Sequence, residues 1–492
     1  MSESDPSPIR AEYESTSPRP TLPPSIEAPG LLIGWSLEEE ARGVPVGFSI
    51  GDPVTHKSSS LIDPILFEEE GHLLTIASTG AGKGIGCIVP ALLTHKGPMV
   101  VIDPKGENAA ITARYRESLG QKVHIVDPMQ VITNQPAAFN PLDGLDPKDP
   151  MCVDEVAAIA QILGAHLNPD TRNAYWVNRG RHLVSAVILH TISLPEESER
   201  TLATVRKILS EAQSQEGKFL YDTLRRSPNS EARAAAGSFN ISANETLSAI
   251  ISMGQDMVDF VRGEPVRTAT STSDFSLDEI TRGDPATIYF VLPPHMLESH
   301  GQLLRLWVST VMRAISRRRA RPKIPTMLLL DEAAQLGEFA PLRQAVTLLR
   351  GYGLQTWSFW QDVSQLKQCF PTSWRTIINN CRVVQAFGAP NMSAARSIAE
   401  LFDIGRPDTI LDLESNEIVV QVAGKDAFIA RRPNYLVEPP FAGKFDPNPF
   451  YSGGDPLKAK PRPIARRSNT SLRRARPQTD EAIAEDLLRR FG

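Results

Sequence analysis

The chain has 492 residues, of which 41% are hydrophobic, and a formal net charge of −5. This length leaves room for two or three domains with ordinary buried cores. The charge excludes a general attraction to nucleic acid, so any such binding must come from local basic patches. The four cysteines show no metal-binding or redox spacing, which is typical of a protein from a reducing cytosol.

No apolar run approaches the length of a membrane-spanning helix, and the first residues lack the basic and then apolar pattern of a secretory signal. We therefore expect a cytoplasmic protein. Residues 1–29 are rich in Ser, Pro and Glu, a composition typical of a disordered tail. In residues 30–70 short apolar pieces alternate with turn residues, which predicts a small β-rich segment.

The sequence ASTGAGKG at residues 77–84 lies between a strand-like apolar run and a helix-like run. Its three glycines let the backbone curl until several N–H groups point at one place, where the dipole of the following helix also points. Such a loop binds phosphate groups. We therefore expect a nucleotide to contact Ser78, Thr79, Gly80, Ala81, Gly82, Lys83, Gly84 and Ile85.

The lysine of this loop carries its main charge. Lys83 would reach the β- and γ-phosphates, while the hydroxyl of Ser78 or Thr79 assists only from the rim. The pattern G-x-x-x-x-G-K-[ST] is broken twice, by Ala77 at the first glycine and by Gly84 where a hydroxyl normally holds Mg²⁺. A glycine-rich turn that binds nothing is therefore the alternative, and residues farther along the chain decide between the two.

The sequence TMLLLDEAAQLG at residues 326–337 is an apolar run that ends in two carboxylates. The run is typical of a buried parallel strand, and acids at the C-terminal end of such a strand project into the crevice where these sheets bind ligands. Asp331 would hold Mg²⁺, directly or through water, and Glu332 could accept a proton from the water that attacks the γ-phosphate. Paired with the GKG loop, the two acids favour a nucleotide site over a solvated acidic turn.

Strand-like and helix-like runs alternate from residue 72, as they do in a parallel sheet. Helical spacing then replaces the strand pattern, which predicts an inserted all-α domain, and the sheet pattern resumes near residue 286. We therefore expect an α/β fold with a mostly parallel central sheet. The expected ranges are 30–148 with 267–440 for the sheet domain, 149–266 for the insert, and 441–492 for a basic Pro/Arg-rich tail with a short helix.

Polar side chains follow two other strand-like runs. Residues 103–107, DPKGE, would face the same edge as the loop, where they either line the site or form a plain turn. Gln361 ends the run GLQTWSFWQ, and an amide there could distinguish ATP from ADP and orient the attacking water. A solvated amide at the end of a strand is the alternative, and the order of the strands decides between them.

Five segments occur in a fixed order: GKGIGCIVPALL, VVIDPKGE, LLLDEAAQLG, LLRGYGLQTWSFWQDVSQL and IINNCRVVQAFGA. With the all-α insert between the second and the third, they resemble the coupling ATPases of type IV secretion and conjugative DNA transfer. The resemblance covers roughly residues 71–430. Glycine after the P-loop lysine is common in that family, so Gly84 is expected there, and Ala77 is the milder departure.

The resemblance implies a RecA-like P-loop NTPase fold, a homo-hexameric ring, ATP with Mg²⁺ bound between subunits, and single-stranded DNA with its attached protein as cargo. By matching position, Lys83 binds phosphate, Asp331 and Glu332 serve metal and base, and Gln361 senses the nucleotide. Arg350 in LLRGYG matches the position from which an arginine of the neighbouring subunit would reach the γ-phosphate. Hydrolysis would then depend on assembly.

Members of that family usually begin with membrane-spanning helices that dock on the secretion channel, and this sequence contains no such run. A separate partner that brings the protein to the inner membrane would fit, and so would a soluble relative with another task. Two functions therefore stay open. One is a motor that delivers DNA or nucleoprotein, with relaxase or effector proteins as substrates, to the channel. The other is a soluble NTP-dependent switch or scaffold that recruits protein substrates without pumping DNA.

Two basic patches are candidates for contacts with DNA. The first follows a predicted helix, where cations suit the C-terminal dipole, so a solvated helix end is its alternative. It consists of Arg317, Arg318, Arg319, Arg321 and Lys323. The second is the Pro- and Arg-rich stretch at 458–476, for which DNA, anionic lipid and inert disorder stay open. Residues 480–491 have a helix-like apolar spacing that could dock on a partner.

Overall fold

The structure is a computed structural model, and it describes residues 22–37, 62–167, 174–214, 217–239 and 244–451. Most of the expected N-terminal tail lies outside these residues. The middle of the 30–70 segment, the basic stretch at 458–476 and the apolar spacing at 480–491 also lie outside them.

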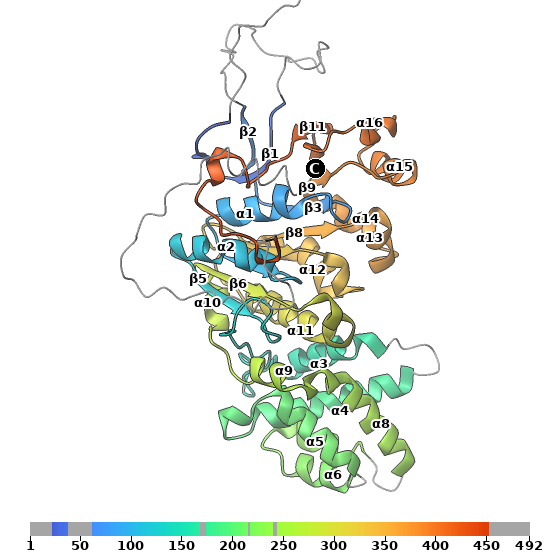
Figure 1. The fold of residues 1–492 in the computed structure, drawn as a ribbon. Coiled ribbons are helices and arrows are strands. Elements are labelled where there is room, and N and C mark those ends of the chain that lie inside the picture. Colours follow the sequence, from blue (N-terminus) through green and yellow to red (C-terminus); the bar gives the residue numbers. More distant parts are fainter. Residues whose placement is uncertain (1–21, 38–61, 168–173, 215–216, 240–243, 452–492) are drawn as a thin grey trace, which may run out of the picture.

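The described residues form an eleven-stranded sheet with the order β2-β1-β11-β10-β9-β3-β8-β7-β4-β6-β5 (Figure 1). The strands from β9 to β5 run parallel, and β10, β11, β1 and β2 extend the sheet with antiparallel pairs. The predicted α/β class with a mostly parallel sheet is confirmed. The strands are β1 (Leu31–Trp35), β2 (Pro64–Phe67), β3 (His72–Ile76), β4 (Met99–Ile102), β5 (Lys122–Val126), β6 (Ala286–Phe290), β7 (Thr326–Leu330), β8 (Leu354–Trp360), β9 (Cys381–Ala386), β10 (Glu417–Val422) and β11 (Phe428–Arg431).

Between β5 and β6 the described residues form helices and no strand, and α3 to α8 gather at the end of the molecule farthest from β1 and β2 (Figure 1). Helical structure continues past residue 266, because α9 spans that position and α10 follows it. The α-helices are α1 (Val89–Thr94), α2 (Glu107–Ser118), α3 (Cys152–Leu163), α4 (Ala174–Ile192), α5 (Leu202–Ser214), α6 (Lys218–Arg225), α7 (Ser230–Ala236), α8 (Asn244–Val258), α9 (Glu264–Ala269), α10 (Leu277–Arg282), α11 (Leu297–Ser316), α12 (Ala340–Leu348), α13 (Val363–Cys369), α14 (Trp374–Asn379), α15 (Met392–Leu401) and α16 (Asp408–Leu411).

The central parallel strands are buried on both faces, because apolar side chains pack against each face of the sheet. In β7, Leu328 and Leu330 enter one hydrophobic cluster, while Met327 and Leu329 enter another on the opposite face. A strand with two buried faces needs apolar residues at every position. This requirement explains why the run TMLLL is continuously apolar instead of alternating with polar residues.

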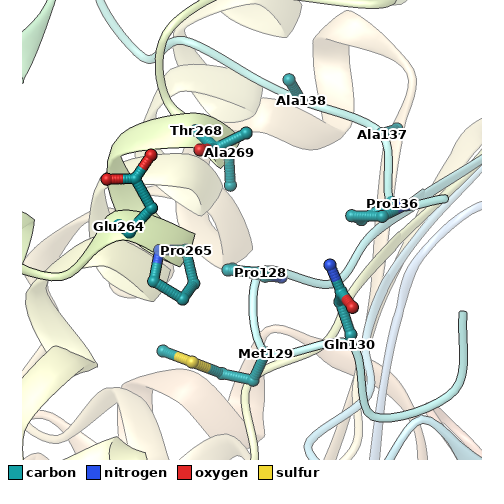
Figure 2. A pocket seen from close by; sticks show the side chains of 10 residues that line it. All are labelled: Pro128, Met129, Gln130, Pro136, Ala137, Ala138, Glu264, Pro265, Thr268 and Ala269. Carbon is teal, nitrogen blue, oxygen red and sulfur yellow. The ribbon is translucent and has the colours of Figure 1, made fainter. Parts of the chain in front are cut away.

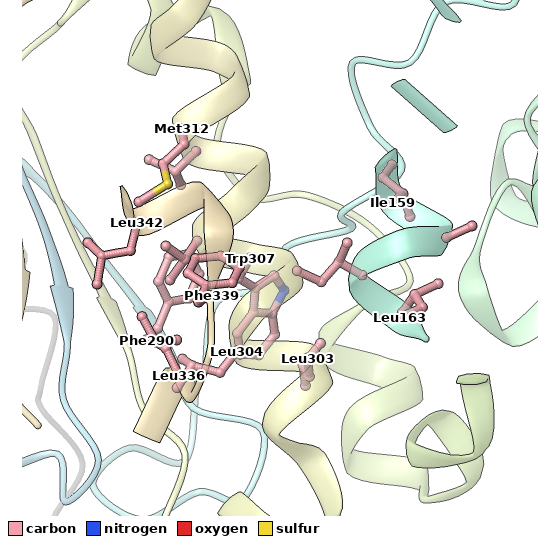
Figure 3. Close-up of a cluster of buried hydrophobic side chains, with 14 of the residues drawn as sticks. Ile159, Leu163, Phe290, Leu303, Leu304, Trp307, Met312, Leu336, Phe339 and Leu342 are labelled. Carbon is pink, nitrogen blue, oxygen red and sulfur yellow. The ribbon is translucent and has the colours of Figure 1, made fainter. Parts of the chain in front are cut away.

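Helix α11 joins the helical insert to the sheet (Figure 3). Its Trp307 stacks on Phe290 at the end of β6, with ring centroids 5.1 Å apart, and donates its indole N–H to the carbonyl of Phe139 at 3.1 Å. Ile159 and Leu163 of α3 belong to the same hydrophobic cluster. The insert therefore shares a hydrophobic core with the sheet.

In the described part of the chain, no helix combines the length and the apolar character needed to cross a membrane. The four cysteines are buried free thiols. Among the described residues, no group of three or more His, Cys, Asp or Glu side chains is arranged to hold a metal ion.

Candidate nucleotide site

The loop after β3 has the curled backbone that its glycines predict. Gly80 and Gly82 have φ angles of +80° and +88°, in the left-handed region that glycine adopts without strain. A helix starts at Lys83 and passes through a π-type turn, Gly84–Ile88, into α1. Of the two hydroxyl-bearing residues before it, Thr79 is exposed and Ser78 is half-buried. Backbone amides at the start of this helix are therefore presented beside the C-terminal end of β3, as anion binding requires.

Both carboxylates that follow β7 lie against the lysine of the loop. Lys83 Nζ is 2.8 Å from Asp331 Oδ1 and 2.9 Å from Glu332 Oε2. Burial acts to lower the pKa of Lys83, but the attraction of the two carboxylates outweighs it and the pKa is raised. The structure thus brings to one point the lysine expected to bind phosphate and the two acids expected to serve metal and water.

Gln361 lies at the end of β8 and joins the same cluster. Strand β8 pairs with β3 on one side and with β7 on the other, so its last residues lie between the loop and the two acids. Gln361 Nε2 donates a hydrogen bond of 2.8 Å to Glu332 Oε1. The strand order therefore favours a side chain that lines the site over a solvated amide.

Glu332 has an unusual backbone conformation, with φ +76° and ψ +63°. This left-handed geometry costs a residue other than glycine about 1–3 kcal/mol and persists only where the surroundings hold it. The carboxylate is held on both sides, by Lys83 and by Gln361. A strained residue with a doubly fixed carboxylate is consistent with a catalytic role for Glu332.

Residues 103–107 follow β4, which pairs with β7 in parallel. They therefore lie beside the residues that follow β7, at the C-terminal ends of the strands. Asp103 is buried and accepts hydrogen bonds from the backbone N–H of Ala109 at 2.8 Å and from Asn108 Nδ2 at 3.1 Å. The same Asn108 amide donates to Asp331 Oδ2 at 3.2 Å. Asn108 thus orients the predicted metal ligand. Sequence reasoning missed this residue, although its place in the first turn after DPKGE was a usable indication.

Burial raises the pKa of Asp103 to about 8, and its hydrogen bonds counter this only in part. A carboxyl group whose folded pKa exceeds its unfolded value stabilises the fold at acidic pH, and this contribution is lost as the pH rises toward the folded pKa. We expect Asp103 to lower the free energy of unfolding between about pH 5 and about pH 8. Denaturant titrations at both pH values should show a smaller pH dependence for Asp103→Asn than for the wild type. An unchanged pH dependence would contradict the assignment.

Arg350 lies at the N-terminal ends of the parallel strands, whereas the site lies at their C-terminal ends. Arg350 is exposed in the 3₁₀ turn Leu349–Tyr352 before β8, whereas Gln361 follows β8, so a strand of seven residues, roughly 20 Å long, separates them. Its charge acts on His72 at the start of β3: burial first, and Arg350 second, lower the pKa of His72 to about 4. Arg350 therefore cannot reach the site of its own chain, and it could serve only the site of another subunit.

The interpretation of the first basic patch as a solvated helix end is wrong for Arg318. This residue is only 6% exposed and donates hydrogen bonds of 3.1 Å to the carbonyls of Tyr352 and Gly353. Arg321 donates to the carbonyl of Arg350 at 3.4 Å. The carbonyls of Arg350 and Gly353 also accept backbone N–H groups, from Gly353 at 3.0 Å and from Thr326 at 2.9 Å, so the guanidinium groups add to these hydrogen bonds. The two guanidinium groups therefore fix the turn that carries Arg350, and Arg318 is not available to DNA phosphates.

Arg432, the residue after β11, contacts the phosphate loop from the antiparallel side of the sheet. Its Nη1 donates to the carbonyl of Ala81, and its guanidinium carbon lies 5.3 Å from the ring centroid of Phe387. Sequence reasoning missed this residue. It is 351 positions from its partner, it lies just beyond the span of the family resemblance, and no local pattern marks it.

A hollow of about 410 Å³ lies elsewhere, where the connection after β5 meets α9 (Figure 2). Its lining contains one charged side chain, an acid, and no cation that could bind a phosphate. The nucleotide is therefore expected at the cluster around Lys83. The hollow is lined by Pro128, Met129, Gln130, Pro136, Ala137, Ala138, Glu264, Pro265, Thr268 and Ala269.

A parallel sheet with a phosphate loop after β3, acids after β7 and an intervening strand β8 defines a RecA-like P-loop NTPase. The family model described as type IV secretory system conjugative DNA transfer matches residues 47–402. The chain belongs to this family.

Curated relatives agree with this assignment, and solved structures agree with the fold. The chain is 24% identical over 441 residues to the conjugal transfer protein TraG of Escherichia coli, which covers 76% of this chain and 68% of TraG. It is 26% identical over 382 residues to the coupling protein VirD4 of Bartonella quintana (strain Toulouse), which covers 75% of this chain and 59% of VirD4. The plasmid coupling protein TrwB in complex with the ATP analogue ADPNP has a TM-score of 0.58 at 18% identity, over 74% of this chain and 85% of TrwB. TrwB with ADP and Mg²⁺ has a TM-score of 0.52 at 17% identity, over the same shares of the two chains. The RecA-type fold is thereby confirmed.

Proposed function

We propose that this chain is the ATPase of a conjugative DNA transfer or type IV secretion system. In this role it binds ATP and Mg²⁺ and uses hydrolysis to move or deliver DNA or nucleoprotein to the channel. The observation that carries the proposal is the cluster of Lys83, Asp331, Glu332 and Gln361 at the C-terminal ends of the parallel strands. The chain that contains this cluster belongs to the conjugative DNA transfer family. The complexes of TrwB with ADPNP and with ADP and Mg²⁺ support the choice of nucleotide and metal.

The residues present fit a nucleotide with a divalent cation. The loop offers curled backbone amides and a lysine. The facing strand ends offer two carboxylates and the carboxamide of Gln361, and the first turn of α2 offers the carboxamide of Asn108. The phosphates would draw Lys83 away from Asp331 and Glu332, which frees both carboxylates for their roles. When bound at Asp331, Mg²⁺ would neutralise charge on the β- and γ-phosphates. Asn108 keeps Asp331 oriented through its hydrogen bond.

In hydrolysis Glu332 would accept the proton of the attacking water, and Gln361 would orient that water toward the γ-phosphate. The hydrogen bond between the two side chains keeps base and water-orienting amide in a fixed relation. Arg350 of a neighbouring subunit would stabilise the charge that develops in the transition state. The active assembly is then a closed ring, a homo-hexamer, whose sites each need two chains.

The partners of this ring would be DNA, relaxase or effector proteins as substrates, and the secretion channel or a separate membrane protein. Such partners would hold a cytoplasmic ring at the periphery of the inner membrane. A soluble switch that recruits proteins without pumping DNA is the competing outcome.

DNA is expected to stimulate ATP hydrolysis by the wild-type chain, because a motor couples turnover to its track. The stimulation should fall steeply as the salt concentration rises, since contacts with phosphates release counterions. Steady-state ATPase rates with single-stranded and double-stranded DNA at low and high salt test this. Lys83→Ala protein prepared in parallel measures contaminating activity. ATPase rates that do not change when either kind of DNA is added at low salt would favour the protein-recruiting switch.

A further inference from the structure

The side chain of Arg432 lies flat along the phosphate loop and the start of its helix. A Cβ atom built on Gly82 would lie 2.8 Å from Arg432 Nη1, and a Cβ atom on Gly86 would lie 2.5 Å from Arg432 Cγ and Cδ. Gly82 has a positive φ, but Gly86 lies in a helical turn where alanine is conformationally acceptable. The same Cβ atom would lie 3.2 Å from the carbonyl oxygen of Pro433. Glycine at position 86 is therefore required by these neighbours, the arginine stem first, and not by its own backbone conformation.

The guanidinium of Arg432 meets a carbonyl and an aromatic face instead of a carboxylate. Its Nη1 donates to the carbonyl of Ala81, and the ring of Phe387 lies beneath its central carbon. Charge-assisted hydrogen bonds of this kind are stronger than neutral ones, and a cation over an aromatic ring is also attracted to it. The guanidinium of Arg432, which follows the antiparallel strand β11, therefore holds the loop through the carbonyl of Ala81.

We infer that Arg432 is a positioning residue that sets the phosphate loop for nucleotide binding, an inference that rests on the proposed ATPase function. In a planar trans peptide the C=O and the N–H point in opposite directions. Holding the carbonyl of Ala81 against Arg432 therefore keeps the N–H of Gly82 turned away from it, toward the open side of the loop. Gly80 and Gly82, on either side of Ala81, have no side chains that could fix this orientation.

This role predicts a particular kinetic result. The N–H of Gly82 would contact the phosphates equally in the bound substrate and in the transition state. Loss of its orientation therefore weakens binding of ATP and ADP alike and raises KM, while kcat at saturating ATP is kept. A loss of kcat with unchanged affinity, as expected for the catalytic groups, would be a different result.

Equilibrium binding of fluorescent ATP and ADP analogues to the full chain, with steady-state kinetics, tests the inference. Arg432→Met should weaken both nucleotides by about tenfold and leave kcat within about twofold of wild type. Arg432→Lys keeps the charge and most of the stem, so it should recover part of the affinity. Lys425→Met removes one exposed charge from the turn between β10 and β11, and it should bind both nucleotides normally.

Gly86→Ala provides an independent second variant, because its methyl group pushes the arginine stem off the loop while Arg432 stays in the chain. It should weaken both nucleotides in the wild-type background and have little further effect in Arg432→Ala, which lacks the Cγ and Cδ atoms that this methyl group would meet. A folded Arg432→Met protein with wild-type affinity overturns the inference. If that variant does not fold, wild-type affinity of Gly86→Ala overturns it instead. Wild-type protein that binds neither nucleotide would refute the proposed function itself, which separates the two failures.

Discussion

Replacing Lys83 by alanine is expected to reduce ATP hydrolysis by at least about 100-fold and to weaken ATP binding, because the side chain supplies the positive charge at the β- and γ-phosphates. Replacing Glu332 by glutamine should instead leave ATP bound and uncleaved, with turnover lower by about 100- to 10,000-fold, because the amide cannot accept the proton of the attacking water. Nucleotide binding measured beside steady-state turnover separates the two effects.

Each variant has a matched control on the same part of the fold. Lys96→Ala removes an exposed lysine just after α1, away from the loop, and Glu338→Gln neutralises an exposed acid a few residues after Glu332. Both controls should keep wild-type turnover. Glu332→Gln protein that hydrolyses ATP at the wild-type rate would refute its role as the base. Lys83→Ala protein with normal affinity would remove the loop as the phosphate site.

Alanine in place of Arg350 is expected to leave ATP binding near normal and to abolish most turnover, because the guanidinium acts on charge that develops only in the transition state. Arg350 lies beyond the far end of β8 from the site of its own chain. We therefore expect each site to receive its guanidinium from a neighbouring chain. Mixing Arg350→Ala with Lys83→Ala chains should therefore restore activity. In a random equal mixture, about a quarter of the interfaces pair an intact loop with an intact arginine.

This complementation needs a demonstrated mixed oligomer, shown by pulling down one tagged variant and detecting the other. Arg396→Ala, which removes an exposed arginine of α15, should be active alone and serves as the control for a general loss of charge. A mixed oligomer that stays inactive would sink the role of Arg350 in a neighbouring site. Arg350 would then be an exposed turn residue whose backbone is held by Arg321.

Local chemistry made part of the candidate site predictable. A curled glycine loop with a lysine, and an apolar run that ends in two acids, each need only neighbouring residues in sequence, so both patterns indicated their structures correctly. The two-sided burial of β7 likewise follows from a continuous run of apolar residues. The order of the five segments was enough to place the chain in its family.

The sequence by itself thus determined the class of fold, the loop at Lys83 and the acids at Asp331 and Glu332. Only the tertiary structure decided which strands are neighbours, because crossover connections let successive parallel strands take several positions in a sheet. The insertion of β8 between β3 and β7 is what brings Gln361 to Glu332. The same holds for Asn108 at Asp331, because their hydrogen bond depends on β4 pairing with β7. The contact of Arg432 with the phosphate loop joins residues 351 positions apart, and no local pattern encodes such a distance.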